Sequence, residues 1–476
     1  MSDKYEMTIG IECHVQLATK TKLFSGIDND ARDKEPNACV SPGDYAIPGT
    51  LPVLNEAAVG LAIRGGLALK GKVNLKSRFD RKHYFYPDLP GGYQRTQFFH
   101  PIIGEGEVVL PNGNRVGIHH AHLEEDAGKL THFGDYSLVD LNRAGTPLIE
   151  IVSHPDIHSA EDARLFAEEL WRLMTYSGAC LGDLYHGNMR FDVNVSVAEK
   201  GAKELGIRTE IKNINSFRSI ERAAAYEFER HVALIENGEA VKRETRGWND
   251  ATGKTTGQRS KETADDYLQF PDSDVPPLNL TKEYVDEIAA KMPKLPQDYR
   301  AVFREAGVAD KTIETLLDHQ VLAERLGQVL EITDMKITIK VANLFVGTLL
   351  AEENSGLNYR AASAERLAEL AKMNEDGELS STATKQVLVA LYNKNNGEKL
   401  TKALAKEMNL LQENNDAALG AIIDEVLADK AAASAIADIK NGEQKAIGFL
   451  IGLIMKKSQG KANPGRAREL LLKKIG

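Results

Sequence analysis

The composition of the chain changes near Thr281, and no other feature of the sequence limits the fold as strongly. Before this point glycine, proline, asparagine and β-branched residues are frequent, and many short segments alternate between apolar and polar residues, as strands do. After it alanine, leucine, glutamate and lysine dominate and proline is rare, which favours helices. We therefore predict an α+β fold, with a mostly antiparallel sheet and inserted helices first and an all-α part second.

Local signals divide the chain further. Helical periodicity is clear at residues 160–177 and 220–236, and Asn112-Gly113 lies between alternating segments, which predicts a hairpin turn. Residues 393–397 interrupt the helical part, and a length of 476 residues is consistent with about three domains. We expect domains at residues 1–292, 293–400 and 401–476, the last a small helical tail domain.

The sequence lacks signals for a membrane or for secretion. No apolar run approaches the roughly 20 residues that cross a bilayer, and the N-terminus has no basic segment followed by an apolar one. The three cysteines, Cys13, Cys39 and Cys180, form no CxxC pair, which is typical of a reduced cytosolic protein. We expect a cytoplasmic protein with no membrane partner and no cysteine-rich zinc site.

Charge is distributed unevenly along the chain. The net charge is −10, which disfavours a general nucleic-acid binder, yet residues 456–476 contain seven basic residues and one acidic residue. This basic tail therefore carries +6, and the rest of the chain carries −16. Such a tail indicates either a contact with a polyanion or only a solvated helix end, and charge alone leaves both open.

Residues 9–17 predict a strand with one buried and one polar face. The odd positions are apolar, and the even positions include Glu12, His14 and Gln16. Glu12 and His14 then project to the same side about 7 Å apart, where they can share a metal. Cys13 points into the core, so a nucleophilic cysteine flanked by Glu12 and His14 is not expected.

The same alternation recurs in two further segments, 189–197 and 207–213. Their polar faces mix acids, cations and amides: Arg190, Asp192, Asn194 and Ser196 in one, and Arg208, Glu210 and Lys212 in the other. An ordinary solvent-facing strand also alternates, but three strands of this character favour a functional surface.

A run of acids, Glu124, Glu125 and Asp126, precedes Gly128-Lys129 and predicts a hard-cation site with a phosphate-binding lysine. Zinc held by His120 and His122 is the alternative, although oxygen-rich sites favour Mg²⁺.

Two more segments carry candidate residues. Glu150 lies inside an apolar run, where an acid is costly unless it is paired or binds a metal, and Lys82 lies in a segment of cations and aromatics suited to a nucleotide. Standard nucleotide motifs are absent. The segment 251–257 resembles a phosphate loop, but Trp248 occupies the position of its first glycine. If ATP binds, it binds in a less common fold.

Five segments together closely resemble the B subunit of the bacterial tRNA-dependent amidotransferases. They are IGIECHVQL at 9–17, FDRKHYFYP at 79–87, LEEDAGK at 123–129, DLNRAGTPLIEIV at 140–152 and EIKNINSF at 210–217. The resemblance extends to residues 462–464 and so covers nearly the whole chain.

The resemblance implies a function. The family acts in a heterotrimer with an amidase, which is the A subunit, and with a small C subunit. It converts Glu-tRNA(Gln) to Gln-tRNA(Gln), or Asp-tRNA(Asn) to Asn-tRNA(Asn). The B subunit would activate the side-chain carboxylate with ATP and Mg²⁺ to an acyl phosphate, which ammonia from the amidase then displaces. The N-terminal part would be a catalytic cradle, and the helical part with its tail would bind the tRNA body.

The resemblance also suggests roles for residues. Glu12, His14, Glu125, Asp192 and Glu210 are expected as catalytic metal ligands, with Glu124 and Glu150 as further metal candidates. Lys82, Lys129, Arg190 and Lys212 are assigned to phosphate or substrate on their chemistry. Some family members carry a cysteine-ligated zinc, and because this chain has no such cysteine pair we expect no structural zinc.

Two alternatives stay open. One is a non-catalytic scaffold that positions charged tRNA for a partner's active site. Clustered acids near a polyanion count against it. The other is a free-standing Mg²⁺-dependent ligase for a small molecule, in which the tail would be dispensable. The sequence contains no Ser-Gly-rich amidase signature, so ammonia is expected from a partner. It does not say which of the two charged tRNAs is the substrate.

Overall fold

The computed structural model of the protein describes residues 4–214, 216–258, 267–351, 356–393, 396, 399–412, 416–440, 445–458 and 461–475. The chain forms two compact units, Met1–Pro296 and Gln297–Gly476. The two units divide after Pro296, and the domain boundary at residue 292 remains a prediction. Part of the predicted interruption at residues 393–397 lies outside the described residues.

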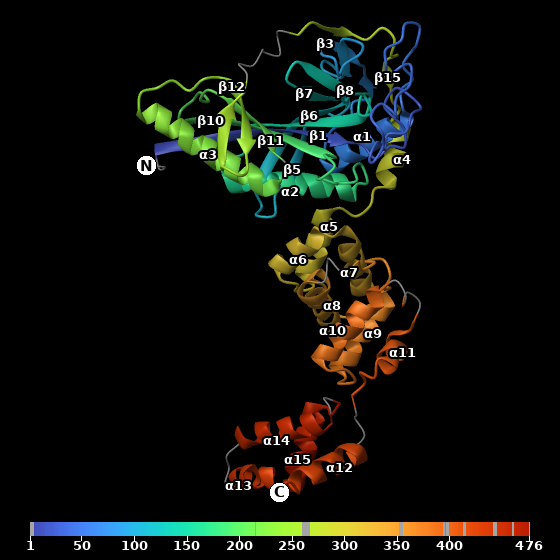
Figure 1. Ribbon diagram of the computed structural model, residues 1–476, viewed down its shortest axis with the longest axis vertical. Coiled ribbons are helices and arrows are strands. Elements are labelled where there is room, and N and C mark those ends of the chain that lie inside the picture. The colour runs from blue at the N-terminus through green and yellow to red at the C-terminus, as the bar shows by residue number, and fades with distance from the viewer. Residues whose placement is uncertain are drawn as a thin grey trace. The chain divides into compact units, whose positions relative to one another are not determined.

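A large sheet forms the centre of the first unit (Figure 1). Within the described residues it has eleven strands, in the order β13-β12-β11-β10-β1-β9-β6-β4-β3-β14, and β5 pairs with β6 beside this path. The strands are β1 (Tyr5–Gln16), β3 (Asp80–His83), β4 (Tyr93–Thr96), β5 (Gly106–Val109), β6 (Arg115–Glu125), β9 (Pro147–Ser153), β10 (Met189–Glu199), β11 (Thr209–Ile214), β12 (Glu244–Asn249), β13 (Lys254–Gly257) and β14 (Gln269–Pro271). Only β11 and β12 are parallel among these pairs, which confirms the mostly antiparallel sheet.

Helices cover one face of this sheet. The odd residues of β1, among them Ile9, Ile11 and Val15, are fully buried, as their alternation predicted. The helices α1 (Glu56–Ala68), α2 (Ala160–Tyr176) and α3 (Phe217–Glu236) pack against the strands. Each buried aliphatic side chain contributes about 1.5–3 kcal/mol. The polar residues of the strands are thereby directed to the other face.

Local sequence fixes where these helices begin and end. The hydroxyl of Ser159 accepts a hydrogen bond from the backbone N–H of Asp162 and starts α2, and Ser216 starts α3 in the same way. Gly178 and Gly238 follow the helices with φ angles of 71° and 74°, a conformation that favours glycine and stops a helix. Both helices confirm the predicted periodicity, and Gly113 forms the predicted turn between β5 and β6.

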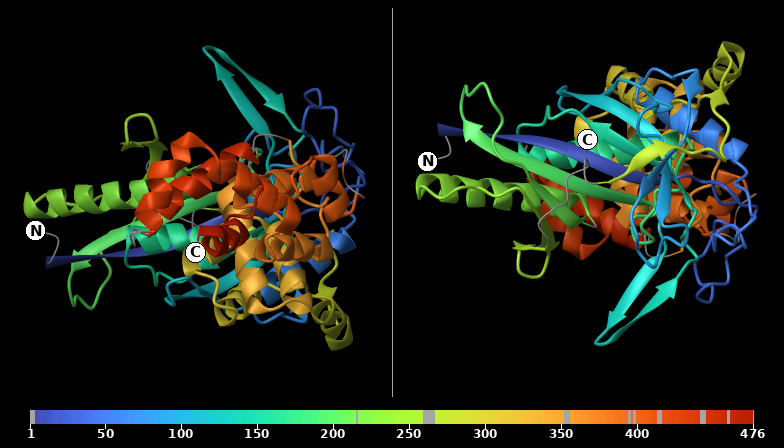
Figure 2. Two further views of the ribbon diagram at one scale, coloured as in Figure 1. Left: turned by 90° about the horizontal axis from the view of Figure 1, so that it is seen from below. Right: turned by 90° about the horizontal axis from the view of Figure 1, so that it is seen from above.

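Smaller elements complete the first unit. The strand β2 (Lys76–Ser77) pairs with β15 (Leu278–Asn279), and α4 (Lys282–Ala290) packs against α1. The strands β7 (Lys129–Phe133) and β8 (Tyr136–Asp140) form a separate hairpin, which projects from the unit (Figure 2).

The second unit is helical, as its composition predicted. It contains α5 (Pro296–Glu305), α6 (Asp310–Leu317), α7 (Gln320–Ile332), α8 (Met335–Leu344), the π-helix η3 (Phe345–Leu349), α9 (Ala364–Glu375), α10 (Ser381–Tyr392), α11 (Thr401–Glu407), α12 (Asp416–Leu427), the short η6 (Lys430–Ala432), α13 (Ala433–Lys440), α14 (Lys445–Lys457) and α15 (Pro464–Ile475). No helix among the described residues is long and apolar enough to cross a bilayer.

Packing separates the last helices from those before them. Leu419, Ile423, Leu450, Ile454 and Leu471 belong to one hydrophobic core that α12, α14 and α15 share. The helix α11, in contrast, packs against α9 and α10. The core of the tail therefore begins after α11, and the domain boundary at residue 400 remains a prediction.

Candidate active site

Strand register gathers the polar residues on the face of the sheet that the helices leave uncovered. Directly opposed residues of neighbouring strands point to the same side. His14 of β1 lies opposite Glu150 of β9, and Glu150 lies opposite His122 of β6. On the other side of β1, Glu12 lies opposite Asp192 of β10. The alternation that is visible within each strand thus becomes a continuous polar surface.

A cavity of about 990 Å³ lies over this surface. Its wall is formed across most of the sheet, from β12 near one edge to β14 at the other. Residues that are far apart in the sequence therefore meet in the cavity. The residues that line it are Glu12, His14, Lys82, Thr96, Phe98, His120, His122, Glu124, Glu150, Val152, Asp192, Arg208, Glu210, Lys212, Arg243, Thr245, Gln258, Tyr267 and Gln269.

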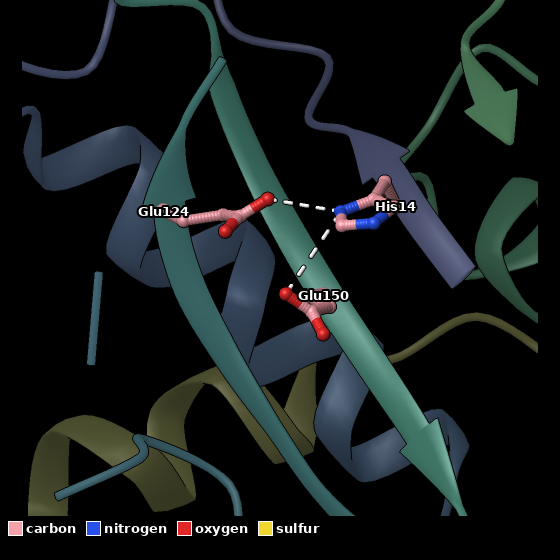
Figure 3. Close-up of side chains that lie close together, drawn as sticks. All are labelled: His14, Glu124 and Glu150. Atoms are coloured by element: carbon pink, nitrogen blue, oxygen red, sulfur yellow. Dashed lines mark hydrogen bonds and ion pairs between the residues drawn. The ribbon is translucent and has the colours of Figure 1, made fainter. Parts of the chain in front are cut away.

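The first cluster in the cavity consists of His14, Glu124 and Glu150 (Figure 3). The Nδ1 atom of His14 lies 2.9 Å from Oε1 of Glu124 and 3.9 Å from Oε2 of Glu150. Burial disfavours the charged imidazole, but the hydrogen bond with Glu124 and the nearby carboxylates raise the pKa of His14 to about 9. In the absence of a cation, this histidine is protonated at neutral pH and pairs with the two acids.

His122 supports the same cluster. Its Nε2 atom lies 3.4 Å from Oε2 of Glu150, while its buried Nδ1 atom has no hydrogen-bond partner among the described residues. Burial alone would raise the pKa of Glu150, but His122, His14 and Lys82 hold it well below its usual range. Glu150 is an acid within an apolar run, where burying an unpaired carboxylate would be unfavourable. Its ion pairs with the histidines remove that cost.

The second cluster consists of Glu12, Asp192 and Glu210. The Nδ2 atom of Asn194 donates to Oε1 of Glu12, at 3.1 Å. The Nζ atom of Lys212 lies 2.6 Å from Oδ2 of Asp192 and 3.7 Å from Oε1 of Glu210. Burial lowers the pKa of Lys212, but the surrounding carboxylates outweigh it and raise the pKa. Lys212 thus neutralises part of the cluster.

Both clusters fit a hard divalent cation. Within each, one ligand atom per residue lies within 4.8 Å of the others, and five of the six groups are carboxylates. Oxygen-rich sets of this kind suit Mg²⁺, and a single imidazole is compatible with it. Glu12 and His14, which the sequence placed together, belong to different clusters. Residues two apart on a strand are about 7 Å apart, whereas cross-strand neighbours approach to about 5 Å.

Glu125 does not line the cavity, although the sequence placed it among the metal ligands. It follows Glu124 directly, so its side chain points to the other face of the strand. Its Oε1 atom accepts a hydrogen bond from the backbone N–H of Arg95, at 2.9 Å, and the Arg95 guanidinium also contacts Asp272. Burial raises the pKa of Glu125, partly offset by Arg95. Its geometry is that of a partner of Arg95.

The four expected phosphate-binding cations separate into two groups. Lys82 and Lys212 line the cavity. Arg190 instead donates to Oδ2 of Asp126 at 2.8 Å, and Lys129 is exposed at the start of the β7–β8 hairpin. Neither of these two residues is in the cavity wall.

The sequence missed several residues of the cavity. Arg208 was visible on a polar strand face, and His122 was considered only as a zinc ligand. Arg243, Gln258, Gln269, Phe98 and Tyr267 lie outside the alternating segments, and no pattern in the sequence marked them. The zinc alternative has limited support: the rings of His120 and His122 stack 5.2 Å apart over the cavity, but neither belongs to a three-residue ligand set within the described part of the chain.

The sheet with its two carboxylate clusters and adjoining cations defines a class of site: a cavity whose carboxylates fit divalent cations and whose cations fit a polyanionic substrate. Comparison with known proteins narrows this class. Residues 7–286 match the model of the GatB/GatE catalytic domain, and residues 327–475 match that of the GatB domain.

Curated relatives match over the full length. The B subunit of the aspartyl/glutamyl-tRNA(Asn/Gln) amidotransferase of Hahella chejuensis is 42% identical, over 99% of this chain and all of the relative. The protein of the same name from Thermotoga maritima is 38% identical over 99% of both chains. The chain therefore belongs to the family of amidotransferase B subunits, as the sequence motifs indicated.

Proposed function

We propose that this protein activates the side-chain carboxylate of Glu-tRNA(Gln) or Asp-tRNA(Asn) with ATP and Mg²⁺, giving an acyl phosphate that ammonia converts to the amide. The enzyme is then a ligase that forms a carbon–nitrogen bond. Full-length relatives named as subunits of such an amidotransferase support the proposal. The observation that carries it is a cavity in which two carboxylate clusters and several cations meet.

The chemistry requires two displacements. A carboxylate oxygen forms a bond to the terminal phosphorus of ATP, and the bond from that phosphorus to the oxygen of ADP breaks. Ammonia then attacks the carbonyl carbon, loses a proton and expels inorganic phosphate. Negative charge accumulates around the transferred group in the first step, so fixed cations stabilise it. Lys82, Arg208, Lys212 and Arg243 are the cavity's candidates for this role.

The two clusters are our candidates for the metal sites. His14, Glu124 and Glu150 would hold one Mg²⁺ ion, and Glu12, Asp192 and Glu210 a second. A bound Mg²⁺ supplies positive charge at phosphate oxygens. Asn194 and Thr245 orient the second set, since they donate to Glu12 and Glu210 at 3.1 and 2.9 Å. Glu125, Lys129 and Arg190 are not proposed as ligands of this cavity, because they lie outside its wall.

Partners follow from the same assignment. We propose an amidase as the A subunit, which supplies ammonia, and a small C subunit, in a cytoplasmic complex. A cytoplasmic location agrees with three buried cysteines that form no disulfide.

The tail is our candidate surface for the tRNA body. Three of its seven basic residues pair with acids of α12: Lys457 with Glu425 at 2.8 Å, Arg466 with Asp416 at 2.7 Å and Lys474 with Asp424 at 2.5 Å. Within the described part of the tail, four basic residues have no such ion pair. Lys461 donates to Oδ1 of Asn409 at 2.9 Å, and Lys456, Arg468 and Lys473 are the cations we assign to phosphates.

Release of labelled phosphate from γ-labelled ATP tests the proposal, with the A and C subunits present and with or without Glu-tRNA(Gln). We expect release that needs both Mg²⁺ and the charged tRNA, and formation of a hydroxamate when hydroxylamine replaces ammonia. Glu150→Gln and Glu210→Gln should each abolish release while tRNA binding remains. Glu229→Gln, an exposed acid of α3, is the control.

The scaffold alternative predicts a different outcome. A protein that only positions tRNA would bind it, but the cluster variants would not change phosphate release by the assembly. That result would place carboxylate activation on a partner and refute our assignment of the cavity.

A further inference from the structure

The cavity has two chemically different ends, and the strand order separates them. Cations gather at the β11–β12 end, where Arg208, Lys212 and Arg243 line the wall. Aromatic side chains lie at the opposite end, where Phe98 follows β4 and Tyr267 precedes β14. The carboxylates come from β6, β9, β1 and β10, which lie between these ends, and, for Glu210, from β11 itself. A substrate bound at one end of the cavity therefore contacts cations, whereas a substrate bound at the other end contacts aromatic side chains.

The two substrates of the proposed function differ in the same way, because one carries many negative charges and the other carries unpaired bases. ATP brings a triphosphate with several negative charges, which matches the end with three cations. The charged end of tRNA brings unpaired nucleotides and one free carboxylate. Lys82 is the one cation of the described cavity wall that lies on the strands of the aromatic end, and its Nζ atom is 5.3 Å from the centre of the Tyr267 ring. One cation suits one carboxylate.

Phe98 is placed to contact a base. Its side chain lines the cavity and is 50% exposed, so the ring is accessible to a ligand in the cavity. The backbone around it is fixed. The buried Gln97 accepts a hydrogen bond from the N–H of Leu123 at 3.0 Å, and the N–H of Phe99 donates to the buried Asp80 at 3.1 Å. A rigid, half-exposed aromatic ring is a typical platform for an unpaired base.

We propose that Phe98 stacks on the base of the 3′-terminal adenosine of the charged tRNA, while the phosphates of ATP occupy the β11–β12 end. This inference rests on the proposed function, because it takes its two substrates from there. Lys82 then faces the side-chain carboxylate, and the two substrates approach each other over the carboxylate clusters. Both ATP and the tRNA terminus carry an adenine base that could stack on Phe98. The test must therefore distinguish these two sources of adenine.

Phe98→Leu in the assembled heterotrimer tests which substrate occupies the aromatic end of the cavity. Phosphate release gives separate KM values for Glu-tRNA(Gln) and for ATP. We expect the KM for the charged tRNA to rise about 5- to 100-fold, the effect of losing one stacked base, with the KM for ATP unchanged. Phe98→Trp should restore the KM for tRNA, which a merely structural role would not predict.

Phe99→Leu is the matched control. Phe99 is 52% exposed and contacts the Phe98 ring at a centroid distance of 4.9 Å, but it does not line the cavity. We expect both KM values to stay unchanged in this variant.

Two results would overturn the inference. A raised KM for ATP with an unchanged KM for tRNA would assign the ring to the adenine of ATP. The two substrates would then occupy the opposite ends of the cavity from those we propose. Unchanged values for both substrates would remove Phe98 from the site. Failure of the proposed function looks different, because the wild-type assembly itself would release no phosphate in response to charged tRNA. Binding of intact tRNA and of tRNA without its terminal adenosine then decides: Phe98→Leu must abolish any preference for the intact form, and a retained preference refutes stacking.

Discussion

The buried carboxylate of Glu227 makes the stability of the N-terminal unit depend on pH. Its side chain is fully buried on α3, and its oxygens lie 2.7 Å from Nη2 of Arg230 and 3.2 Å from Nε of Arg246. The hydroxyl of Thr255 also donates to it. Burial alone would raise the pKa of this carboxyl, but the hydrogen bonds from His231, Arg230 and Thr255 lower it to about 2.

This shift sets the size of the effect. A lowering of the pKa from 4.5 to about 2 corresponds to about 3 kcal/mol of folding free energy at neutral pH. The folded pKa is below the unfolded value, so the stabilisation is present above pH 4.5 and is lost as the pH falls through about 2. At pH 3, about 1 kcal/mol remains.

Urea unfolding of wild type and Glu227→Gln measures the difference. Both tryptophans of the chain, Trp171 and Trp248, lie in the N-terminal unit, so their fluorescence follows that unit. We expect Glu227→Gln to reduce the free energy of unfolding by about 3 kcal/mol at pH 7 and by about 1 kcal/mol at pH 3. Glu229→Gln should have almost no effect, because Glu229 is exposed. A difference that stays constant between the two pH values would refute the reasoning.

Three further predictions concern metal binding, the tail and a helix start. Glu124→Gln should weaken Mn²⁺ binding at least about tenfold, measured by isothermal titration calorimetry. Glu125→Gln should leave Mn²⁺ binding unchanged, because the Glu125 side chain points away from the cavity. Equal effects of the two variants would contradict our assignment of the metal site. Reversing the charges of Arg468 and Lys473 should weaken tRNA binding and reduce its salt slope by about two, measured by anisotropy titrations at several salt concentrations, since each phosphate contact adds about 0.9; an unchanged slope would exclude the tail from the contact. Ser159→Ala should reduce the free energy of unfolding of the N-terminal unit by about 1 kcal/mol, measured with urea, because α2 loses its N-cap; unchanged stability would show that the cap contributes nothing.

The sequence by itself indicated three strands with their polar faces, two helices of the N-terminal unit and the helical nature of the second unit. Alternation in residues 9–17 predicted β1, with Ile9 and Ile11 inward and Glu12 and His14 outward, because the period of a strand is two wherever it lies. Helical periodicity predicted α2, and an Asn-Gly pair predicted the turn before β6. These are local properties of the backbone, so local sequence is enough to reveal them. The same positions carried the motifs that identified the family.

Only the tertiary structure decided which of these residues meet. Glu12 and His14 are two residues apart on β1, yet they join different clusters because each is closer to its partners across the strands. The sequence placed Glu125 ahead of Glu124 as a metal ligand, but the alternation of β6 directs Glu124 into the cavity and Glu125 to Arg95. Phe98 and Arg243 follow no pattern and reach the cavity only through the pairing of distant strands. Strand pairing is a long-range property, since the energy that fixes it comes from packing the whole sheet against its helices, and no local window of sequence contains it.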